Sequence, residues 1–198
     1  MLLAYLRGLA VHVWRSPYRW PRSFEAVRAR RAAGVDEREL VYGETPVFTA
    51  WWILRRAKLG SDDAMVDLSA GRGRPLFGAR LRTPHVKGYE LIEERVAPVR
   101  RSLTSAGITL LVADGTEADL SHTDVALITW TGFSDELVRR FERAARTLPD
   151  GARFVAIDRP MSDSNGFEEL GQFSVLCTWG IVPVWIYVRR LDSAQHGG

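Results

Sequence analysis

Three acidic residues close successive strand-like runs in the middle of the chain, and a glycine loop follows the first of them. Asp67 ends an apolar run and precedes the spaced pair Gly71 and Gly73, Glu90 ends the next run, and Asp114 ends the third. A strand that turns into a helix through glycines lets a nucleotide approach the backbone, because no side chain blocks it. The three acids therefore predict one nucleoside-like ligand across the carboxyl ends of three neighbouring strands.

Glu90 is the strongest single candidate among these acids. It lies about 20 residues beyond the glycine loop, where a carboxylate can accept two hydrogen bonds from ribose hydroxyls. The alternative is a surface acid that happens to follow a strand. Asp114 precedes Gly115, so its alternative is a turn-forming role.

The elements around these residues alternate as they do in α/β proteins. Five strand-like runs precede a closing hairpin: 64–68, 86–90, 109–113, 125–129 and 153–157. Three helical runs lie among them: 76–82, 93–106 and 134–148. The hairpin is expected to pair 173–178 with 184–190 through a link at 180–183. This order predicts a parallel sheet that ends in an antiparallel pair.

The charge is concentrated at the beginning of the chain. Of 198 residues with a net charge of +3, residues 1–40 carry eight arginines and four acidic residues, which leaves the remainder near neutral. A near-neutral body argues against a broad nucleic-acid footprint. The arginine-rich segment could contact nucleic acid, an anionic membrane or an acidic protein.

The first 14 residues predict an amphipathic helix, because Leu2, Leu6, Leu9 and Val13 fall on one helical face. This run is too short to span a bilayer, and its flanks do not fit a signal peptide. We expect it to pack on the domain as a lid or brace. The alternative is peripheral membrane contact through residues 1–20. The domain is then expected at 41–191, with a disordered tail at 192–198.

Metal chemistry and disulfides are not expected. Cys177 is the one cysteine and is expected to be buried, and His12, His85, His122 and His196 have no ligand spacing. The chain is expected to be cytoplasmic.

Together, the glycine loop, the acid ending the second strand, the acid after the third and the closing hairpin resemble the class I S-adenosylmethionine (SAM) methyltransferases. This resemblance covers roughly residues 41–191. It implies a Rossmann-like fold with seven strands in the order 3-2-1-4-5-7-6, helices on both faces and SAM as the cofactor.

A second, narrower resemblance lies in the loop Tyr42-Gly43-Glu44-Thr45 before a helix at 46–58, followed by the motifs above and a later Gly132-Phe133 pair. This loop is similar to that of the non-SET histone lysine methyltransferases, the disruptor-of-telomeric-silencing family. The resemblance implies that Tyr42 and Thr45 close over the carboxylate end of SAM. Read without it, Thr45 caps the helix, with Pro46 in the first turn.

The resemblance also implies roles for the residues of the crevice. Asp67 would hold the cofactor's amino group, Gly71 and Gly73 would admit its methionine part, and Asp114, beside Gly115, would take the adenine amino group. At the end of the fourth strand, Thr129 and Trp130 would lie where the methyl group emerges. Trp130 could place an aromatic face near the sulfonium. Its alternative is core packing.

Several positions depart from these families. Ser69 replaces the first glycine of the usual loop, Arg74 stands where glutamine is common, and Thr129 and Trp130 replace an asparagine pair. Ser69 would narrow the pocket or donate a hydrogen bond. No long basic tail follows the domain, which argues against a nucleosome as partner.

These features predict a SAM-dependent methyltransferase that acts on protein lysine or another amine, with a small molecule as the second acceptor class. Weak candidates for a general base are Glu44 and Asp158, and Trp179 could line the acceptor pocket or belong to the core. The alternatives are a SAM-binding protein without catalysis and an NAD-binding oxidoreductase. The oxidoreductase leaves the loop at 42–45 unexplained.

Overall fold

A seven-stranded mixed sheet forms the centre of the molecule. The computed structural model describes residues 6–8, 10 and 43–191. The strands are β1 (Met65–Asp67), β2 (Val86–Glu90), β3 (Thr109–Val112), β4 (Val125–Thr129), β5 (Arg153–Ile157), β6 (Phe167–Cys177) and β7 (Gly180–Arg189). Their order is β3-β2-β1-β4-β5-β7-β6. Neighbours among β1 to β5 pair in parallel, and β7 is antiparallel to both β5 and β6. The predicted order and the antiparallel closing pair are confirmed.

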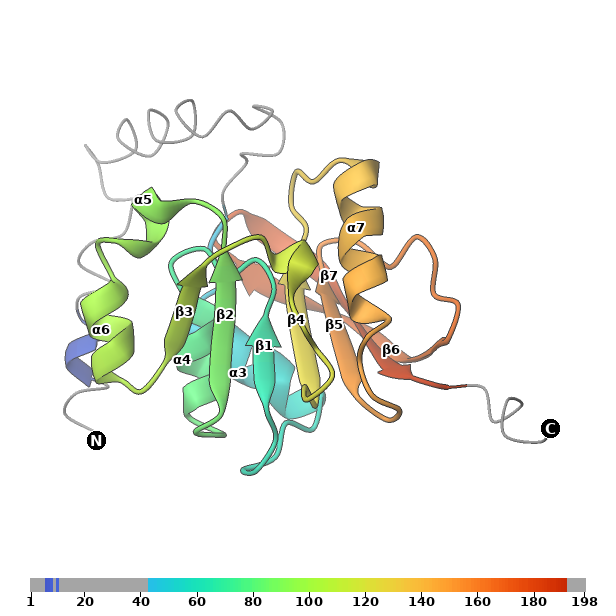
Figure 1. Cartoon of the computed structure of the whole chain (residues 1–198), viewed down its shortest axis with the longest axis horizontal. Helices are drawn as coiled ribbons and strands as arrows, with labels where there is room; N and C mark the ends of the chain where they lie inside the picture. The colour runs from blue at the N-terminus through green and yellow to red at the C-terminus, as the bar shows by residue number, and fades with distance from the viewer. Residues whose placement is uncertain (1–5, 9, 11–42, 192–198) are drawn as a thin grey trace.

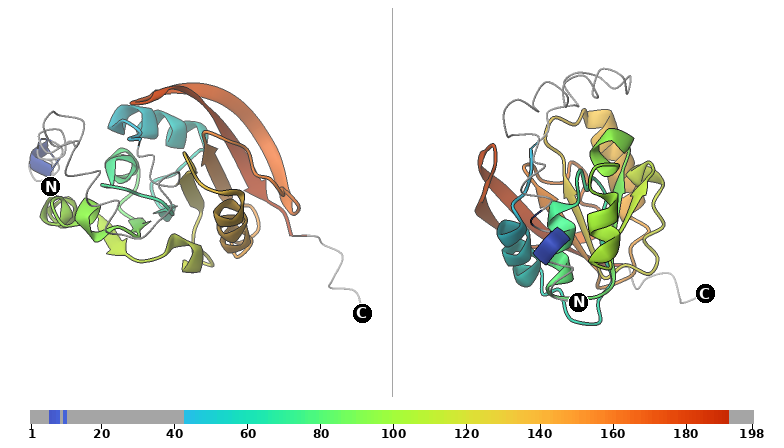
Figure 2. Two further views of the ribbon diagram at one scale, coloured as in Figure 1. Left: turned by 90° about the horizontal axis from the view of Figure 1, so that it is seen from above. Right: turned by 90° about the vertical axis from the view of Figure 1, so that its left-hand side faces the viewer.

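Helices cover both faces of this sheet, as predicted (Figure 1). The helices are α3 (Val47–Arg56), α4 (Arg74–Arg80), α5 (Glu93–Val96), α6 (Arg100–Ser105) and α7 (Asp135–Ala145), with a short 3-10 turn, η1 (Gly115–Glu117). Figure 2, seen from above, shows α3 and α7 on opposite sides of the sheet. Apolar side chains of α3, α4 and α6 build one core with one face of the sheet, and those of α7 build the other.

The short strand β1 lies at the centre and positions the glycine loop. It pairs with β2 on one side and β4 on the other, and all three of its residues are buried. The chain runs from β1 outward to β2 and β3 and then crosses back to β4, so the crevice between β1 and β4 is the topological switch point. Open α/β sheets bind their ligands at such a point, beyond the carboxyl ends of the strands.

Two helix predictions need correction. The run predicted as one helix over 93–106 is divided between α5 and α6, with Pro98 in the gap. Proline has no backbone N–H and its ring collides with the carbonyl four residues earlier, so one continuous helix is disfavoured. Thr45 does not cap α3, because the N-cap is Pro46 and no side chain caps it.

The closing hairpin is longer than predicted, and its link was misplaced. β6 begins at Phe167, and only Thr178 and Trp179 separate it from β7. Pro183 indicated a turn but lies inside β7 opposite Ser174, and its carbonyl accepts the N–H of Asp158 at 2.9 Å. The first part of β6 was not predicted because its sequence is polar. Polar residues fit there because β6 lies at the edge of the sheet, where one side can face water.

The predicted extension at 1–40 is described only at residues 6–8 and 10, which are helical. A Cβ on Gly8 would lie 3.0 Å from the carbonyl oxygen of Ser102 and 3.1 Å from the ring of Phe77. This short piece therefore lies against α6 and α4, as a brace would. Membrane contact through residues 1–20 stays a prediction, and the predicted tail at 192–198 lies outside the described residues. Among the helices described, none is both long and apolar enough to cross a bilayer.

Candidate functional site

The glycine loop leaves β1 and enters α4 through left-handed backbone. Gly71 and Gly73 have φ angles of 55° and 80°, which side chains rarely tolerate. A Cβ on Gly73 would also lie 2.9 Å from Leu103. The N–H of Ala70 donates to the carbonyl of Tyr89 at 2.8 Å, which anchors the loop on β2. The loop's path therefore depends on glycine at both positions.

Asp67 lies at the end of β1 and is only 1% exposed. Its Oδ1 accepts the N–H of Ser69 at 3.1 Å, whereas its buried Oδ2 has no hydrogen-bond partner among the described residues. Burial raises the pKa of Asp67 to about 7; the Ser69 hydrogen bond opposes this shift and the charge of Glu90 adds to it. A buried oxygen without a partner is costly and is rare in folded proteins, which points to a donor supplied by a ligand.

Glu90 ends β2 beside β1 and is 5% exposed. Its Oε1 accepts the N–H of Ile92 at 2.9 Å and lies 3.3 Å from the guanidinium of Arg95. The carboxylate is therefore held inside the fold, so the alternative of a surface acid does not describe it. A carboxylate has about four acceptor positions and can add partners to these two.

Ser69 joins the ends of β1 and β4. Its hydroxyl accepts the N–H of Thr129 at 3.1 Å and donates to the carbonyl of Thr129 at 3.2 Å. A glycine cannot make these contacts. The side chain that replaces the usual glycine thus closes part of the crevice and fixes the backbone of Thr129.

Asp114 and Gly115 form the turn after β3. One oxygen of Asp114 accepts the N–H and the hydroxyl of Thr116 at 2.9 and 2.8 Å, and the other lies 2.9 Å from Arg140 of α7. These hydrogen bonds and Arg140 outweigh the effect of partial burial and lower the pKa of Asp114. The turn-forming alternative is thus what the structure shows, and the adenine contact stays a prediction.

Trp130 lies in the core rather than on the crevice. It is 1% exposed, its indole N–H donates to the carbonyl of Arg159 at 2.8 Å, and its ring lies 5.7 Å from that of Phe154. These contacts fit the packing alternative and correct the expectation of an aromatic face at the methyl group. Thr129, its neighbour, does reach the crevice.

The loop before α3 is fixed to the tip of the closing hairpin. The N–H of Glu44 donates to the hydroxyl of Thr178 at 2.9 Å. A Cβ on Gly43 would lie 2.1 Å from the ring of Trp179, so this loop and the hairpin are in close contact. Trp179 packs against the core, and its indole nitrogen has no hydrogen-bond partner among the described residues. Tyr42 lies outside the described residues.

A cavity of about 30 Å³ lies where this loop, the glycine loop and β4 meet. Four predicted site residues line it: Thr45, Ser69, Gly71 and Thr129. Glu44 and Arg74 line it as well. This space is far smaller than a nucleoside, so side chains would have to move before such a ligand could occupy it.

Charged side chains at this cavity form a group that the sequence analysis did not predict. Glu44, 3% exposed, lies 2.9 Å from Arg74 and 3.6 Å from Arg72, measured between side-chain oxygen and nitrogen. From the sequence, Arg74 was identified only as a departure from the family pattern and Glu44 only as a candidate base. Two arginines in a glycine loop, where small residues are usual, were the signal that could have found the group. The carboxylate of this candidate base is thus paired with two arginines.

Asp158, the other candidate base, follows β5 with a φ angle of 88°. This is a conformation that aspartate adopts more readily than most residues, and strained backbone of this kind clusters at functional sites.

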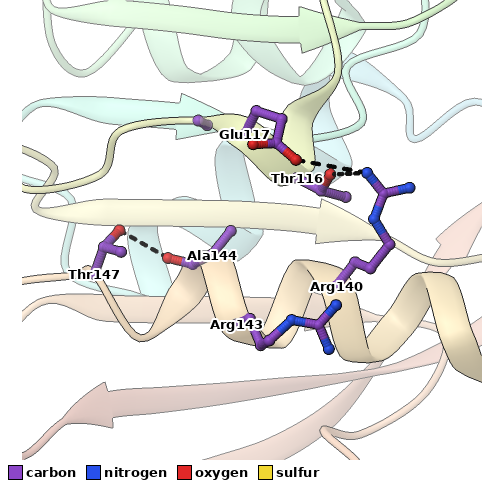
Figure 3. Close-up of a pocket in the computed structure, with 7 residues that line it drawn as sticks. Thr116, Glu117, Arg140, Arg143, Ala144 and Thr147 are labelled. Carbon is purple, nitrogen blue, oxygen red and sulfur yellow. Dashed lines mark hydrogen bonds and ion pairs between the residues drawn. The ribbon is translucent and has the colours of Figure 1, made fainter.

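A second hollow of about 370 Å³ lies between η1 and α7, and Figure 3 shows Arg140 of α7 reaching Thr116 and Glu117 across it. Arg140 lies 2.8 Å from the hydroxyl of Thr116 and 3.6 Å from Glu117. It is a hollow beside the turn at Asp114 and Gly115, and it shares no lining residue with the glycine-loop cavity. No group of histidine, cysteine or acidic residues in the described part of the chain could hold a metal ion.

The fold is shared with known methyltransferases. An RNA methyltransferase from Salinibacter ruber, crystallised with S-adenosyl-L-homocysteine (SAH), superposes with a TM-score of 0.61 at 19% identity over 77% of this chain and 97% of that one. A putative RNA methyltransferase from Pyrococcus horikoshii superposes with a TM-score of 0.62 at 16% identity, over 83% of this chain and 99% of that one.

TrmN from Thermus thermophilus superposes with a TM-score of 0.62 at 22% identity over 72% of this chain. The matched region is 48% of TrmN, so this chain spans about half the length of that protein. No protein-family model matches the sequence, and no curated protein matches it significantly. With the strand order described above, these likenesses show that the chain has the Rossmann-like fold of the class I SAM-dependent methyltransferases.

Proposed function

We propose that the protein is a SAM-dependent methyltransferase. The observation that carries this proposal is the buried, unpartnered Oδ2 of Asp67 beside a glycine loop at the switch point of the sheet. An ammonium group is the donor that such an oxygen fits, because it brings both a charge and three N–H groups. SAM and SAH both carry an ammonium on an amino-acid chain whose sulfur is joined to adenosine, as a sulfonium in SAM and as a thioether in SAH.

The remaining residues fit the rest of the cofactor. Glu90 is buried at the end of β2, next to the edge strand β3. Its carboxylate would accept hydrogen bonds from the ribose hydroxyls in addition to those from Arg95 and Ile92. Gly71 and Gly73 would leave room for the methionine chain, and Thr45 would lie at its end. The turn at Asp114 and Gly115 would receive the adenine, and Tyr42 stays a proposed part of the lid.

Bound SAM supplies a methyl group that its sulfonium already activates for attack. The protein has then to align the acceptor with the methyl carbon and to exclude water. The carboxyl end of β4 is where the acceptor would arrive. Two hydrogen bonds between the Ser69 hydroxyl and the backbone of Thr129 fix that backbone there. A lysine acceptor would have to lose its proton, which burial at this edge would favour by lowering its pKa.

The acceptor class that we propose first is protein lysine or another amine. It rests on the Tyr42–Thr45 loop and its resemblance to the non-SET histone lysine methyltransferases. RNA is the second candidate, because two structurally similar proteins are described as RNA methyltransferases. A small molecule and SAM binding without catalysis are the remaining outcomes of the test.

Methyl transfer from tritiated SAM separates these acceptors. The purified protein is incubated with a protein fraction, an RNA fraction and a small-molecule fraction of one lysate, and label is counted in each. Label in protein that survives ribonuclease supports the amine acceptor, and label lost with ribonuclease supports RNA. SAM binding with no label in any fraction contradicts the enzyme and leaves the non-catalytic binder.

Replacing Glu90 with Ala should weaken SAH binding by about 1–3 kcal/mol, or about 5–150-fold, because hydrogen bonds from the ribose to a charged acceptor are lost. The measurement is isothermal titration calorimetry. Glu93→Ala is the matched control, since Glu93 lies three residues away, pairs with Arg100 and is half exposed. Equal affinity of the Glu90→Ala variant and the wild-type protein would remove Glu90 from the site.

A further inference from the structure

The ion pair between Glu44 and Arg74 closes the cavity at which the cofactor's amino-acid end is proposed to lie. Glu44 comes from the loop before α3 and Arg74 from the first turn of α4, so the pair joins two segments that a ligand has to separate. Both side chains line the cavity, whose volume of about 30 Å³ is far too small for an amino-acid tail. The side chains must rearrange before a ligand can enter.

The chemistry of the pair suggests how this happens. A guanidinium attracts a carboxylate by its charge, and Glu44 supplies that carboxylate from within the chain. An amino-acid tail carries a carboxylate of its own. Glu44 and the ligand would therefore compete for the same donor on Arg74.

Arg72 lowers the electrostatic penalty on Glu44 when Arg74 turns to a ligand. It is 5% exposed and lies 3.6 Å from Glu44, on the oxygen that does not face Arg74. If Arg74 turns to a ligand, Glu44 keeps a positive partner and is not left as an isolated buried charge, which would be strongly unfavourable.

We infer that Glu44 is an internal competitor for the cofactor's carboxylate: it occupies Arg74 in the free protein, and the cofactor binds by displacing it. This inference rests on the proposed function. It assigns Arg74 as the residue that recognises the carboxylate and Glu44 as the residue that limits affinity. Ligands that lack the carboxylate gain nothing from the exchange.

Calorimetry with two ligands tests this inference. SAH carries the carboxylate, and decarboxylated SAH has the same adenosine, thioether and amine without it. In the wild-type protein SAH should bind more tightly. Arg74→Gln should weaken SAH about tenfold or more and leave the decarboxylated ligand unchanged, because only SAH loses a charge-assisted contact.

Glu44→Gln should act in the opposite direction and strengthen SAH by about fivefold or more, since the competitor for Arg74 is neutral. A weaker SAH complex in this variant, or equal changes for both ligands, would show that Glu44 is only a structural brace. If thermal unfolding shows that the Glu44→Gln variant is not folded, Glu44→Asp replaces it in the test. The shorter side chain moves the carboxylate away from Arg74 and should raise SAH affinity in the same way.

The matched control is Arg153→Gln, which removes a partly buried arginine paired with Asp63 at the opposite end of the strands. It should keep the wild-type ratio of the two affinities. Failure of the folded wild-type protein to bind either ligand would contradict the proposed function itself. Normal binding with no response to Arg74→Gln would contradict the exchange alone.

Discussion

Replacing Asp67 with Asn should stabilise the folded protein at pH 8 and leave its stability nearly unchanged at pH 4. The pKa of Asp67 is about 7 in the folded protein against 3.8 for an ordinary aspartate, chiefly because burial disfavours its charge. Between these values the folded state holds a proton that the unfolded state has released. The wild-type protein therefore loses stability as pH rises through this range, by about 1.4 kcal/mol per pH unit, while the Asn variant has no proton to lose.

Urea unfolding of both proteins at pH 4, 5, 6, 7 and 8 measures this difference. The difference in the free energy of unfolding between Asp67→Asn and the wild-type protein should grow from pH 4 to pH 7 and stay constant above pH 7. Its total change should be about 4 kcal/mol. Asp119→Asn is the control, because that exposed carboxylate has its pKa lowered by the N–H of Ser121 and should show the opposite slope. A difference that does not change with pH would mean that Asp67 is not a strained, buried acid.

Keeping an acid at this cost makes sense if it serves binding. Asp67→Asn should also weaken SAH, because the amide cannot give the ammonium a charged partner. A stability gain coupled to a loss of affinity is the usual signature of a site residue.

Replacing Gly115 with Ala should destabilise the protein by about 3 kcal/mol or more, the upper part of the range for overpacking. A Cβ at this position would lie 2.1 Å from the carbonyl oxygen of Leu68 and 3.1 Å from the ring of Phe141. Backbone cannot give way as a flexible side chain does, so the turn after β3 and the start of the glycine loop must separate. Affinity for SAH should fall as well, since both segments border the proposed site.

Gly60→Ala is the control for this substitution. The atoms nearest to a Cβ there belong to Asp63 at 3.5 Å, an ordinary contact. Its stability should stay within about 0.5 kcal/mol of the wild-type value or rise slightly, because alanine restricts the unfolded chain. Equal effects of the two substitutions would show that Leu68 and Gly115 are not in close contact.

The parallel part of the fold could be predicted because its signals are local. β4 and β5 are largely apolar, buried runs, and β2 is a short run between turn residues that ends in an acid. Their predicted limits at 86–90, 125–129 and 153–157 match the structure. The hairpin was predicted less well, since β6 is a polar edge strand and Pro183 lies inside β7, where it pairs with Ser174. Such pairing is a tertiary feature that a single sequence does not reveal.

The site residues also fall into those whose place the local sequence predicts and those whose place depends on tertiary contacts. The positions of Asp67, Glu90 and the glycine loop follow from their places at strand ends, which spacing alone indicates. The core position of Trp130 and the ion pair of Glu44 with Arg74 depend on which segments meet in space. Glu44 and Arg74 are 30 residues apart in the sequence, and no periodicity links them.

Titration of the purified protein with SAH in a calorimeter tests the central proposal most directly. We predict that each chain binds one SAH and that NAD does not bind comparably. Below pH 7, SAH binding should also release a proton from Asp67, because the ammonium of SAH favours the ionised carboxylate. Absence of SAH binding by a protein that unfolds cooperatively, or tight binding of NAD in its place, would contradict the proposal.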